Sequence, residues 1–462
     1  MRERPTFRTT LLLVSDAGIT YAAVLFALFL RLGMEGMVAE LDEGYGWAKP
    51  AVITLFCLIA FYVFDLYDYA VINNRVELRL RLIQALGTAW LTLAVVFFVL
   101  PSLEIGRGTA AYSIIISVVG ILGLRIGIHF LLGHPDLGTR ILIVGDGPVA
   151  IETAEAAINR RDKGYRIVGF ITDEFSEIER KYTWAKRLGH MGELEEIVRF
   201  KSIDRVVIGI REQRGEFPVE ALLRLRLAGI VAIEESPSFI ERVAGHVYLE
   251  MLRPSWLIFS HFRPDTRVKT LAREVLYRFL ALVGLVVSAP IAIAAAVCIK
   301  LNSRGPFLYR QQRVGKNGRI FELIKFRSMK VDAEKTGSPI WASANDDRAT
   351  GVGRFIRKIR VDEIPQFWNI LKGEMSFIGP RPERPEFVEQ LSKEIRFYEH
   401  RHLVAPGLTG WAQIQYPYGA SVEDARRKLE YDLYYIKNQS VTLDVLILLE
   451  TVKTILFGRG GR

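Results

Sequence analysis

The stretch FLALVGLVVSAPIAIAAAVCI, from Phe279 to Ile299, carries no charge over 21 residues and is long enough to cross the hydrocarbon of a membrane. Lys and Arg residues flank both of its ends, whereas a spanning helix keeps its excess positive charge on the cytoplasmic side. Pro290 lies near the middle, where it removes a backbone donor and bends a helix, and the Ser288 hydroxyl can bond to a nearby carbonyl. The pattern predicts a re-entrant helical hairpin over about residues 276–300, which enters and leaves one leaflet. The alternative is an ordinary kinked spanning helix.

Four further apolar stretches lie near the beginning of the chain, at about residues 10–30, 51–67, 82–103 and 108–132. Each is close to the length that a helix needs to cross a bilayer. Arginines precede the first stretch and lie between the second and the third, whereas the loop between the first and the second is acidic. Because cytoplasmic loops carry the excess of Lys and Arg, we expect the N-terminus and the chain after the fourth stretch to face the cytoplasm. Residues 1–135 are therefore predicted to form four transmembrane helices, the first of which lacks the cleavage site of a signal peptide.

Two charged residues, Asp16 and Arg125, lie inside these apolar stretches. Charges within membrane helices often mark a functional site. The structural interpretation, which we favour, is that they lie near segment ends or pair inside the bundle.

The net charge and the cysteine content limit the kinds of molecule that the protein is expected to bind. The 462 residues carry a formal net charge of +10, which fits nucleic acid, anionic lipid or a phosphorylated substrate. Together with the membrane stretches, this favours lipid and phosphorylated substrates, and we expect no nucleic-acid partner. The two cysteines, Cys57 and Cys298, exclude a disulfide framework and a zinc site of the usual spacing.

After the fourth apolar stretch, the sequence changes to short strand and helix patterns, which predict a Rossmann-like domain over residues 136–260. A buried strand at 140–144 precedes Gly145 and Gly147, and helical and strand patterns then alternate, as in a parallel α/β sheet. The glycine spacing matches a dinucleotide-binding loop, with Asp173 as a candidate ribose contact. The alternative is a Rossmann-like domain that binds nothing and only packs.

Adjacent carboxylates mark the chemistry-bearing region. Asp362 and Glu363 directly follow a run that contains four basic residues, and nine Lys or Arg but one acid lie between residues 300 and 330. Arg and Lys are the expected ligands of phosphate. Acids among such residues suggest phosphoryl transfer, with one acid as nucleophile or metal ligand. An ordinary surface pair of acids is the alternative.

Several ordered motifs resemble the bacterial sugar transferase family of monotopic phosphoglycosyl transferases. They are the run 301–315, KFRSM at 325–329, DEIPQ at 362–366, NILKG at 369–373, GPRP at 379–382, PGLTGWAQ at 406–413 and YDLYYIKN at 431–438. The resemblance covers about residue 272 to the C-terminus. With its membrane helices and Rossmann-like domain, the chain resembles the large members, which prime capsule, O-antigen and exopolysaccharide synthesis. PERPEFV at 382–388 and FGRG at 457–460 resemble a subgroup tied to exosortase-type gene clusters. The chain departs from the family where Ala289 interrupts the usual Ser-Pro break and where the hairpin lacks an opening aspartate.

The resemblance implies a catalytic domain at 261–462, α+β and mostly helical, that transfers a hexose-1-phosphate from a UDP-sugar to undecaprenyl phosphate and releases UMP. Asp362 would be the nucleophile that carries the phosphosugar, and Glu363 would orient Mg²⁺ or handle protons, so both acids are candidate metal ligands. The candidate ligands of the nucleotide, the sugar and the phosphates are Lys325, Arg327, Arg357, Arg381, Tyr431 and Asp432. Mg²⁺ would offset the diphosphate charge.

The implied setting is the bacterial inner membrane, with a multi-pass chain whose catalytic domain lies on the cytoplasmic face. The lipid bilayer, a second copy of the chain and downstream glycosyltransferases are the implied partners. The sequence does not identify the hexose. The apolar stretch at 443–457 either lies on the membrane or packs against the catalytic core.

Two other functions fit parts of the sequence. A membrane-tethered nucleotide-sugar dehydratase or epimerase also joins membrane helices to a Rossmann domain, and Tyr182 and Lys186 have the spacing of its Tyr-Lys dyad. That dyad lies in a charged, loop-like stretch, and the domain is short for such an enzyme. A non-enzymatic scaffold for polysaccharide assembly is the other alternative, and it predicts that Asp362→Ala leaves function intact.

Overall fold

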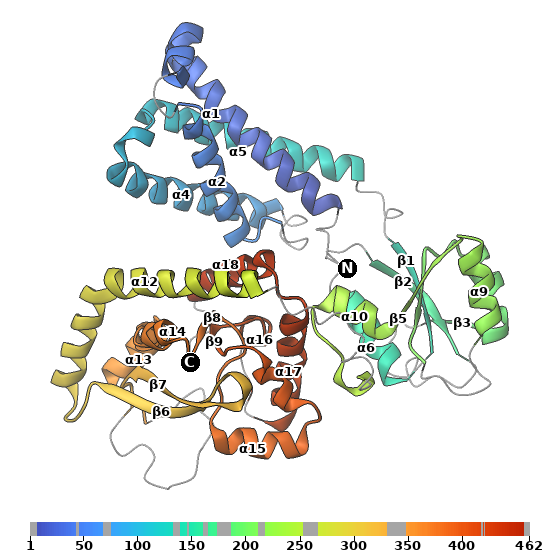
Figure 1. Ribbon diagram of the computed structural model, residues 1–462. Coiled ribbons are helices and arrows are strands. Elements are labelled where there is room, and N and C mark those ends of the chain that lie inside the picture. Colours follow the sequence, from blue (N-terminus) through green and yellow to red (C-terminus); the bar gives the residue numbers. More distant parts are fainter. Residues whose placement is uncertain are drawn as a thin grey trace. The chain divides into compact units, whose positions relative to one another are not determined.

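A computed structural model describes residues 7–42, 46–67, 75–132, 139–145, 147–159, 165–172, 186–210, 218–252, 267–329, 348–416, 419 and 421–456. The chain divides into two compact units, Met1–Ala244 and Gly245–Arg462 (Figure 1). The predicted boundary between the Rossmann-like and catalytic domains lay at residue 260, whereas Gly245–Leu252 packs with the C-terminal unit.

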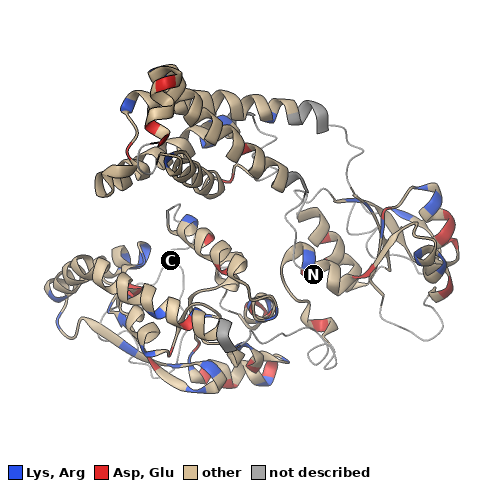
Figure 2. Ribbon diagram, turned by 45° about the horizontal axis from the view of Figure 1, so that its top comes forward, with Lys and Arg blue, Asp and Glu red and all other residues tan. Residues whose placement is uncertain are grey.

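The first unit begins with long apolar helices. They are α1 (Phe7–Asp42), α2 (Ala48–Val63), α4 (Arg75–Val99) and α5 (Arg107–Leu132), with the short helix η1 (Pro101–Leu103) between the last two. Apolar side chains such as Val24, Phe61 and Leu82 are buried between them. Figure 2 shows that charged residues are sparse along the helices of this bundle and frequent on the α/β domain and the C-terminal unit.

Three of the four predicted segments in this bundle are long enough to span a membrane. Among the described residues, the helices of sufficient length and apolar character are Thr10–Asp42, Leu78–Val99, Arg107–Gly127 and, in the second unit, Thr270–Asn302. The helix of the second predicted segment ends earlier than predicted and is shorter than the other three. α2 has 16 residues, or about 24 Å at the rise of an α-helix, and the chain turns after Val63, where Asp65 takes a left-handed conformation.

The two charges inside the bundle form an ion pair, as the structural interpretation predicts. Arg125 Nη2 lies 2.7 Å from Asp16 Oδ2, and both side chains are buried. The pair joins α1 to α5 across 109 residues of sequence. Each charge therefore neutralises the other where water cannot.

The rest of the first unit is a parallel α/β domain. Its elements are β1 (Thr139–Val144), α6 (Pro148–Asn159), β2 (Tyr165–Ile171), β3 (Arg187–Gly189), η4 (Met191–Glu193), α8 (Leu194–Phe200), β4 (Arg205–Ile208), α9 (Val219–Leu227), β5 (Ala232–Glu235) and α10 (Ser236–Ala244). The strand order is β3-β2-β1-β4-β5, and every pairing is parallel. The sheet is the predicted one, and its order reverses between β1 and β4, which is where such folds bind ligands.

The second unit is mostly helical. Its elements are η5 (Leu249–Met251), α12 (Arg267–Asn302), β6 (Leu308–Val314), η6 (Lys316–Gly318), β7 (Ile320–Phe326), α13 (Gly351–Lys358), η7 (Val361–Glu363), α14 (Gln366–Lys372), β8 (Ser376–Ile378), α15 (Pro385–Glu394), η8 (Tyr398–Leu403), β9 (Gly407–Thr409), α16 (Trp411–Gln415), α17 (Val422–Lys437) and α18 (Val441–Leu456). β6 and β7 form an antiparallel hairpin, and β8 pairs with β9 in parallel. The hairpin turns tightly at Asn317 and Gly318, both of which have positive φ.

Helix α12 contains the predicted hairpin stretch and bends between its two halves (Figure 1). Pro290 lies within it, and Ser288 Oγ donates to the Gly284 carbonyl at 2.6 Å. The apolar surface of the helix is largely uncovered: only 11% of its most apolar window is buried, and Val287 is 72% exposed.

Both halves of α12 pack against the same unit. Tyr277 and Ala281 in the first half belong to the main core of the second unit, which we call the catalytic unit because it contains the predicted catalytic domain. Ala295 and Ile299 in the second half pack with Phe326, at the end of β7. A straight helix would carry Tyr277 and Ile299 about 33 Å apart, so the bend is what returns the chain to the catalytic unit.

The apolar stretch at 443–457 packs against the catalytic core, which is one of the two arrangements expected. Ile447 of α18 is fully buried there. The buried Asp444 carboxylate accepts hydrogen bonds from Tyr277 and Tyr435, each at 3.0 Å, and lies 3.5 Å from Arg273. This carboxylate ties α12, α17 and α18 together.

Candidate active site

The two predicted catalytic acids lie on η7, directly after the amphipathic helix α13. Thr350 caps α13 by accepting a hydrogen bond from the Gly353 amide at 2.9 Å. The helix ends at Lys358, and Arg360 takes a left-handed conformation with φ 59°. This conformation costs free energy in a residue with a side chain, and it turns the chain so that the buried Asp362 comes next.

A buried asparagine fixes the next helix against the β6–β7 hairpin. Asn369 Oδ1 accepts from the Ile324 amide at 3.1 Å, and its Nδ2 donates to the Glu322 carbonyl at 2.8 Å. These bonds hold α14 on β7, the strand that carries Lys325. Motifs that are more than 30 residues apart in sequence therefore meet at one place.

Three cations surround Glu363. Its Oε1 lies 3.4 Å from Arg360 Nη1, 3.6 Å from Arg381 Nη2 and 3.8 Å from Lys325 Nζ. Burial alone would raise the pKa of Glu363, but these cations, Lys325 first, outweigh it and hold that pKa below its usual range. Glu363 is therefore ionised at neutral pH.

Asp362 behaves differently although it is the adjacent residue. Burial, together with the charge of Glu363, raises the pKa of Asp362 to about 6, and nearby cations such as Lys325 only partly oppose this. Its Oδ1 atom is buried and has no hydrogen-bond partner among the described residues. A desolvated, unpartnered carboxylate oxygen is a reactive one, because its charge is poorly stabilised before an electrophile arrives.

A metal ion could be held by this pair of acids together with its substrate. The described residues contain no group of three or more His, Cys, Asp or Glu side chains that could bind a metal. Mg²⁺ is commonly bound by one or two carboxylates together with substrate phosphates. The unpartnered oxygen of Asp362 and the ionised Glu363 fit that kind of site.

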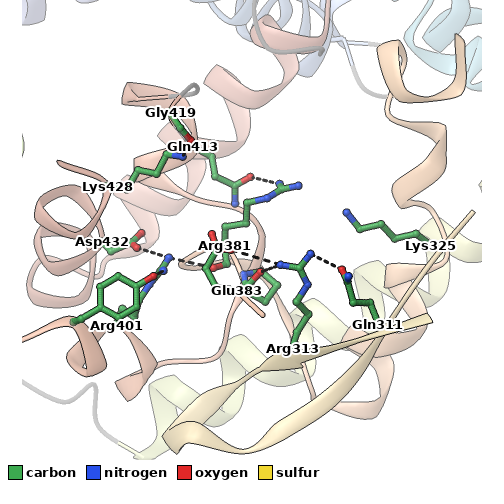
Figure 3. A network of polar contacts seen from close by, with 12 residues as sticks. Gln311, Arg313, Lys325, Arg381, Glu383, Arg401, Gln413, Gly419, Lys428 and Asp432 are labelled. Atoms are coloured by element: carbon green, nitrogen blue, oxygen red, sulfur yellow. Dashed lines mark hydrogen bonds and ion pairs between the residues drawn. The ribbon is translucent and has the colours of Figure 1, made fainter. Parts of the chain in front are cut away.

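A polar pocket opens beside the acids. It is lined by Arg313, Leu323, Lys325, Gln366, Arg381, Pro382, Gly407 and Leu408. Figure 3 shows Arg313, Lys325 and Arg381 directing their side chains into a common space from three segments of the chain. Burial lowers the pKa of Lys325 to about 8 and that of Arg313 to about 10, with Glu363 and Glu383 respectively opposing the shift. Three partly desolvated cations in one pocket suit a multiply charged anion.

A hydrogen-bond network holds Arg381 in place (Figure 3). Its Nη1 donates to Gln413 Oε1 at 3.1 Å, and its backbone carbonyl accepts from Arg401 Nη2 at 3.1 Å. Arg401 is itself buried and pairs with Asp432 at 2.8 Å. Burial raises the pKa of Asp432 to about 6, and Arg401 opposes this shift.

The other predicted ligands lie farther from the pocket. Tyr431 packs its ring against His246, with 5.2 Å between the ring centroids, and neither Tyr431 nor Asp432 lines the pocket. Arg327 is buried and donates to the Ser303 carbonyl and hydroxyl at 3.0 and 2.7 Å, and to the Arg304 carbonyl at 3.1 Å. It thus caps the C-terminal end of α12.

The structure adds residues that sequence reasoning did not single out. They are Arg313, Arg360, Gln366, Arg401 and Gln413. Arg313, Gln366 and Gln413 lie inside motifs that resemble the family, which is the signal that could have identified them. Arg357 lies on α13, and its charge lowers the pKa of Asp362, against the dominant effect of burial.

The candidate nucleotide loop of the α/β domain lies at the reversal of strand order. Gly145 directly follows β1 and has φ 111°, a conformation that favours glycine. Gly209, after β4, packs closely on α6, because a Cβ there would lie 3.0 Å from the Ala150 Cα. Gly147 precedes α6. Asp173 and Tyr182 lie outside the described residues, so ligand binding by this loop stays a prediction.

Two family models match the chain: bacterial sugar transferase at residues 268–458 and CoA-binding domain at residues 62–215. The chain is 51% identical over 182 residues to the UDP-N-acetylgalactosamine-undecaprenyl-phosphate N-acetylgalactosaminephosphotransferase of Aeromonas hydrophila, covering 39% of the chain and 43% of the relative. It is 33% identical to the undecaprenyl-phosphate glucose phosphotransferase of Komagataeibacter xylinus over 70% of the chain and 60% of that relative. It is 32% identical to the UDP-glucose:undecaprenyl-phosphate glucose-1-phosphate transferase of Escherichia coli (strain K12) over 71% of the chain and 70% of that relative. The matched region thus spans less than two thirds of the first two relatives.

Proposed function

The chain belongs to the bacterial sugar transferase family, and on that premise we propose that it transfers a hexose-1-phosphate from a UDP-sugar to undecaprenyl phosphate and releases UMP. The observation that carries the proposal is the position of the buried Asp362 and Glu363 beside a pocket with three cations. A buried carboxylate next to side chains that bind anions suits the transfer of a phosphoryl group.

The reaction has two displacements at one phosphorus atom. An Asp362 carboxylate oxygen attacks the phosphorus that bears the sugar, forming a new P–O bond. The P–O bond to UMP breaks, and its electron pair leaves with the UMP phosphate. An oxygen of undecaprenyl phosphate then attacks the same phosphorus, a diphosphate bond forms, and the electron pair of the broken bond returns to Asp362. Splitting the transfer lets a soluble donor and a lipid acceptor use one site in turn.

The surrounding side chains have separate tasks in this proposal. Lys325, Arg313 and Arg381 line the pocket and would hold the phosphates while the negative charge moves to the leaving group. Glu363 would keep two of these cations ordered, since it lies within 4 Å of Lys325 and Arg381. Bound Mg²⁺, held by the two acids and the substrate, would add neutralisation of the diphosphate charge.

The bent helix α12 supports a re-entrant membrane anchor. Opposite ends of a spanning helix lie on opposite faces of the bilayer, whereas both halves of α12 pack against the catalytic unit. Its uncovered apolar surface would enter one leaflet and hold the site at the depth of the lipid phosphates. The basic loops support the proposal that this face lies in the cytoplasm, and the proposed location of the protein is the bacterial inner membrane. A homodimer and contacts with downstream glycosyltransferases belong to the same proposal.

The donor to test first is UDP-N-acetylgalactosamine. The catalytic region is 51% identical to a relative named for that sugar, against 32–33% for the glucose transferases compared over longer stretches. UDP-glucose is the second donor of the panel.

The test is UMP release by purified protein in detergent with Mg²⁺, with and without undecaprenyl phosphate. Wild type should release UMP in a lipid-dependent way and should carry label from a sugar-phosphate-labelled donor when the acceptor is withheld. Asp362→Asn should lose both signals, whereas Glu389→Gln, at an exposed acid on α15, should keep them. A folded wild type that releases no UMP from any donor of the panel would refute the proposal.

A further inference from the structure

The segment between the two units is built into the catalytic unit. α10 ends at Ala244, and residues Gly245–Leu252 follow it directly; we call them the strap. The strap lies outside both matched family regions, which end at residue 215 and begin at residue 268. Three of its apolar side chains, Val247, Leu249 and Leu252, are 3%, 8% and 5% exposed and belong to the catalytic core.

Polar bonds fasten the strap to two helices. Trp411 Nε1 on α16 donates to the Gly245 carbonyl at 2.7 Å. On α17, the Glu430 carbonyl accepts from the Val247 amide at 3.2 Å, and its carboxylate accepts from the Leu249 amide at 3.1 Å. Glu430 is 2% exposed, so its carboxylate is committed to this contact and to a neighbouring arginine.

The helix α16 joins the strap to Arg381. Trp411 contacts the strap, and Gln413, two residues later, accepts the Arg381 hydrogen bond. Residues two positions apart lie on roughly opposite faces of a helix. α16 therefore lies between the strap on one side and the Arg381 side chain on the other.

The helix α17 repeats the arrangement. Glu430 faces the strap, and Asp432, again two residues later, pairs with Arg401 at 2.8 Å. Arg401 then donates to the Arg381 carbonyl at 3.1 Å. The side chain of Arg381 is thus held through α16 and its backbone through α17, and the strap contacts both helices.

We propose that the strap positions Arg381 for the donor phosphate, with Gly245, Trp411 and Glu430 as positioning residues. The proposal rests on the function proposed above. Because the strap continues α10 without an intervening residue, it is also the segment that connects the first unit to the catalytic unit along the chain. A catalytic fragment that begins at α12 would lack it.

Gly245 allows a matched pair of substitutions. It has φ 71°, and a Cβ there would lie 3.1 Å from Trp411 Cζ2. Gly229, in the first unit, has φ 65°, and a Cβ there would meet nothing within 4 Å. Both alanine variants carry a similar backbone strain, but only Gly245→Ala pushes on Trp411. We expect Gly245→Ala to lower kcat/KM for the UDP-sugar about tenfold and Gly229→Ala to leave it near wild type.

A double-mutant cycle tests whether the effect passes through Arg381. Trp411→Phe removes the N–H donor together with the pyrrole ring that carries it, and it should raise the donor KM in an otherwise wild-type chain. In an Arg381→Met background, Trp411→Phe should change kcat/KM no further. Additive losses in the cycle would overturn the proposal, as would wild-type kinetics in a folded Gly245→Ala. If Gly245→Ala fails to fold, the Trp411 cycle decides alone. An inactive wild type would instead refute the proposed function, so the two failures are distinguishable.

Discussion

Replacing the proposed nucleophile should stabilise the protein while it abolishes the reaction. Burial and the neighbouring Glu363 raise the pKa of Asp362 from 3.8 to about 6. One pKa unit corresponds to about 1.4 kcal/mol, so the ionised carboxylate costs the folded state up to about 3 kcal/mol. Asn has nearly the same shape and no charge. We expect Asp362→Asn to raise the free energy of unfolding at pH 7.5 by about 1–3 kcal/mol.

The pH dependence of this gain follows from the direction of the shift. Between about pH 4 and 6 the folded state binds more protons at Asp362 than the unfolded state, so rising pH lowers stability through this group. The gain in Asp362→Asn should therefore be full above pH 6 and vanish below pH 4. Catalysis by wild type, which needs the carboxylate, should fall as the pH drops through about 6.

The assay is thermal unfolding in detergent, followed by tryptophan fluorescence at several pH values, alongside UMP release. Asp444→Asn is the control, because that buried carboxylate accepts two tyrosine hydrogen bonds. It should destabilise the protein by about 1–3 kcal/mol. A loss of stability in Asp362→Asn at pH 7.5, or a gain that persists at pH 3.5–4, would refute the electrostatic account of this site.

Three further predictions concern other charged groups. Burial lowers the pKa of Lys325 to about 8, so its charge and the catalytic rate should fall as the pH rises through 8. Lys325→Arg should move that fall to higher pH, and an unchanged alkaline limb would contradict the assignment. Asp16→Asn should remove the carboxylate that neutralises Arg125 and cost about 3–5 kcal/mol. Adding Arg125→Gln should recover part of the folded yield in detergent, and equal yields of the single and double variants would argue against the ion pair. Arg327→Met should lower the melting temperature through loss of the α12 cap, whereas a raised donor KM without any loss of stability would favour the phosphate-binding role predicted from sequence.

Local patterns were sufficient for much of the fold. Apolar stretches of the right length predicted the membrane helices, because burying or embedding a helix requires apolar side chains along its length. A buried strand before Gly145 predicted the parallel sheet, since the turn and the hydrophobic period are both local. The second membrane stretch was predicted to end at about residue 67, whereas α2 ends at Val63, because the left-handed turn at Asp65 leaves no trace in hydrophobicity.

The candidate site was only partly visible in the sequence. The acids Asp362 and Glu363 and the cations Lys325 and Arg381 were identified by type and motif, and the structure brings them together. The proposed ligand Arg327 has the same charge as these cations, but it lies against the end of α12. Charge and motif do not distinguish an arginine that binds phosphate from one that bonds to the end of a helix, because both roles require an arginine.

By itself, the sequence determined the kinds of element, the presence of chemistry-bearing acids among cations and the family to which those motifs point. These properties depend on residue type and on spacing along the chain. Only the tertiary structure decided that Asp362 and its neighbour Glu363 have opposite pKa shifts, since desolvation and the distances to Lys325 and Arg360 set them. It also decided that the strap belongs to the catalytic unit, because that depends on bonds to helices more than 150 residues away in sequence.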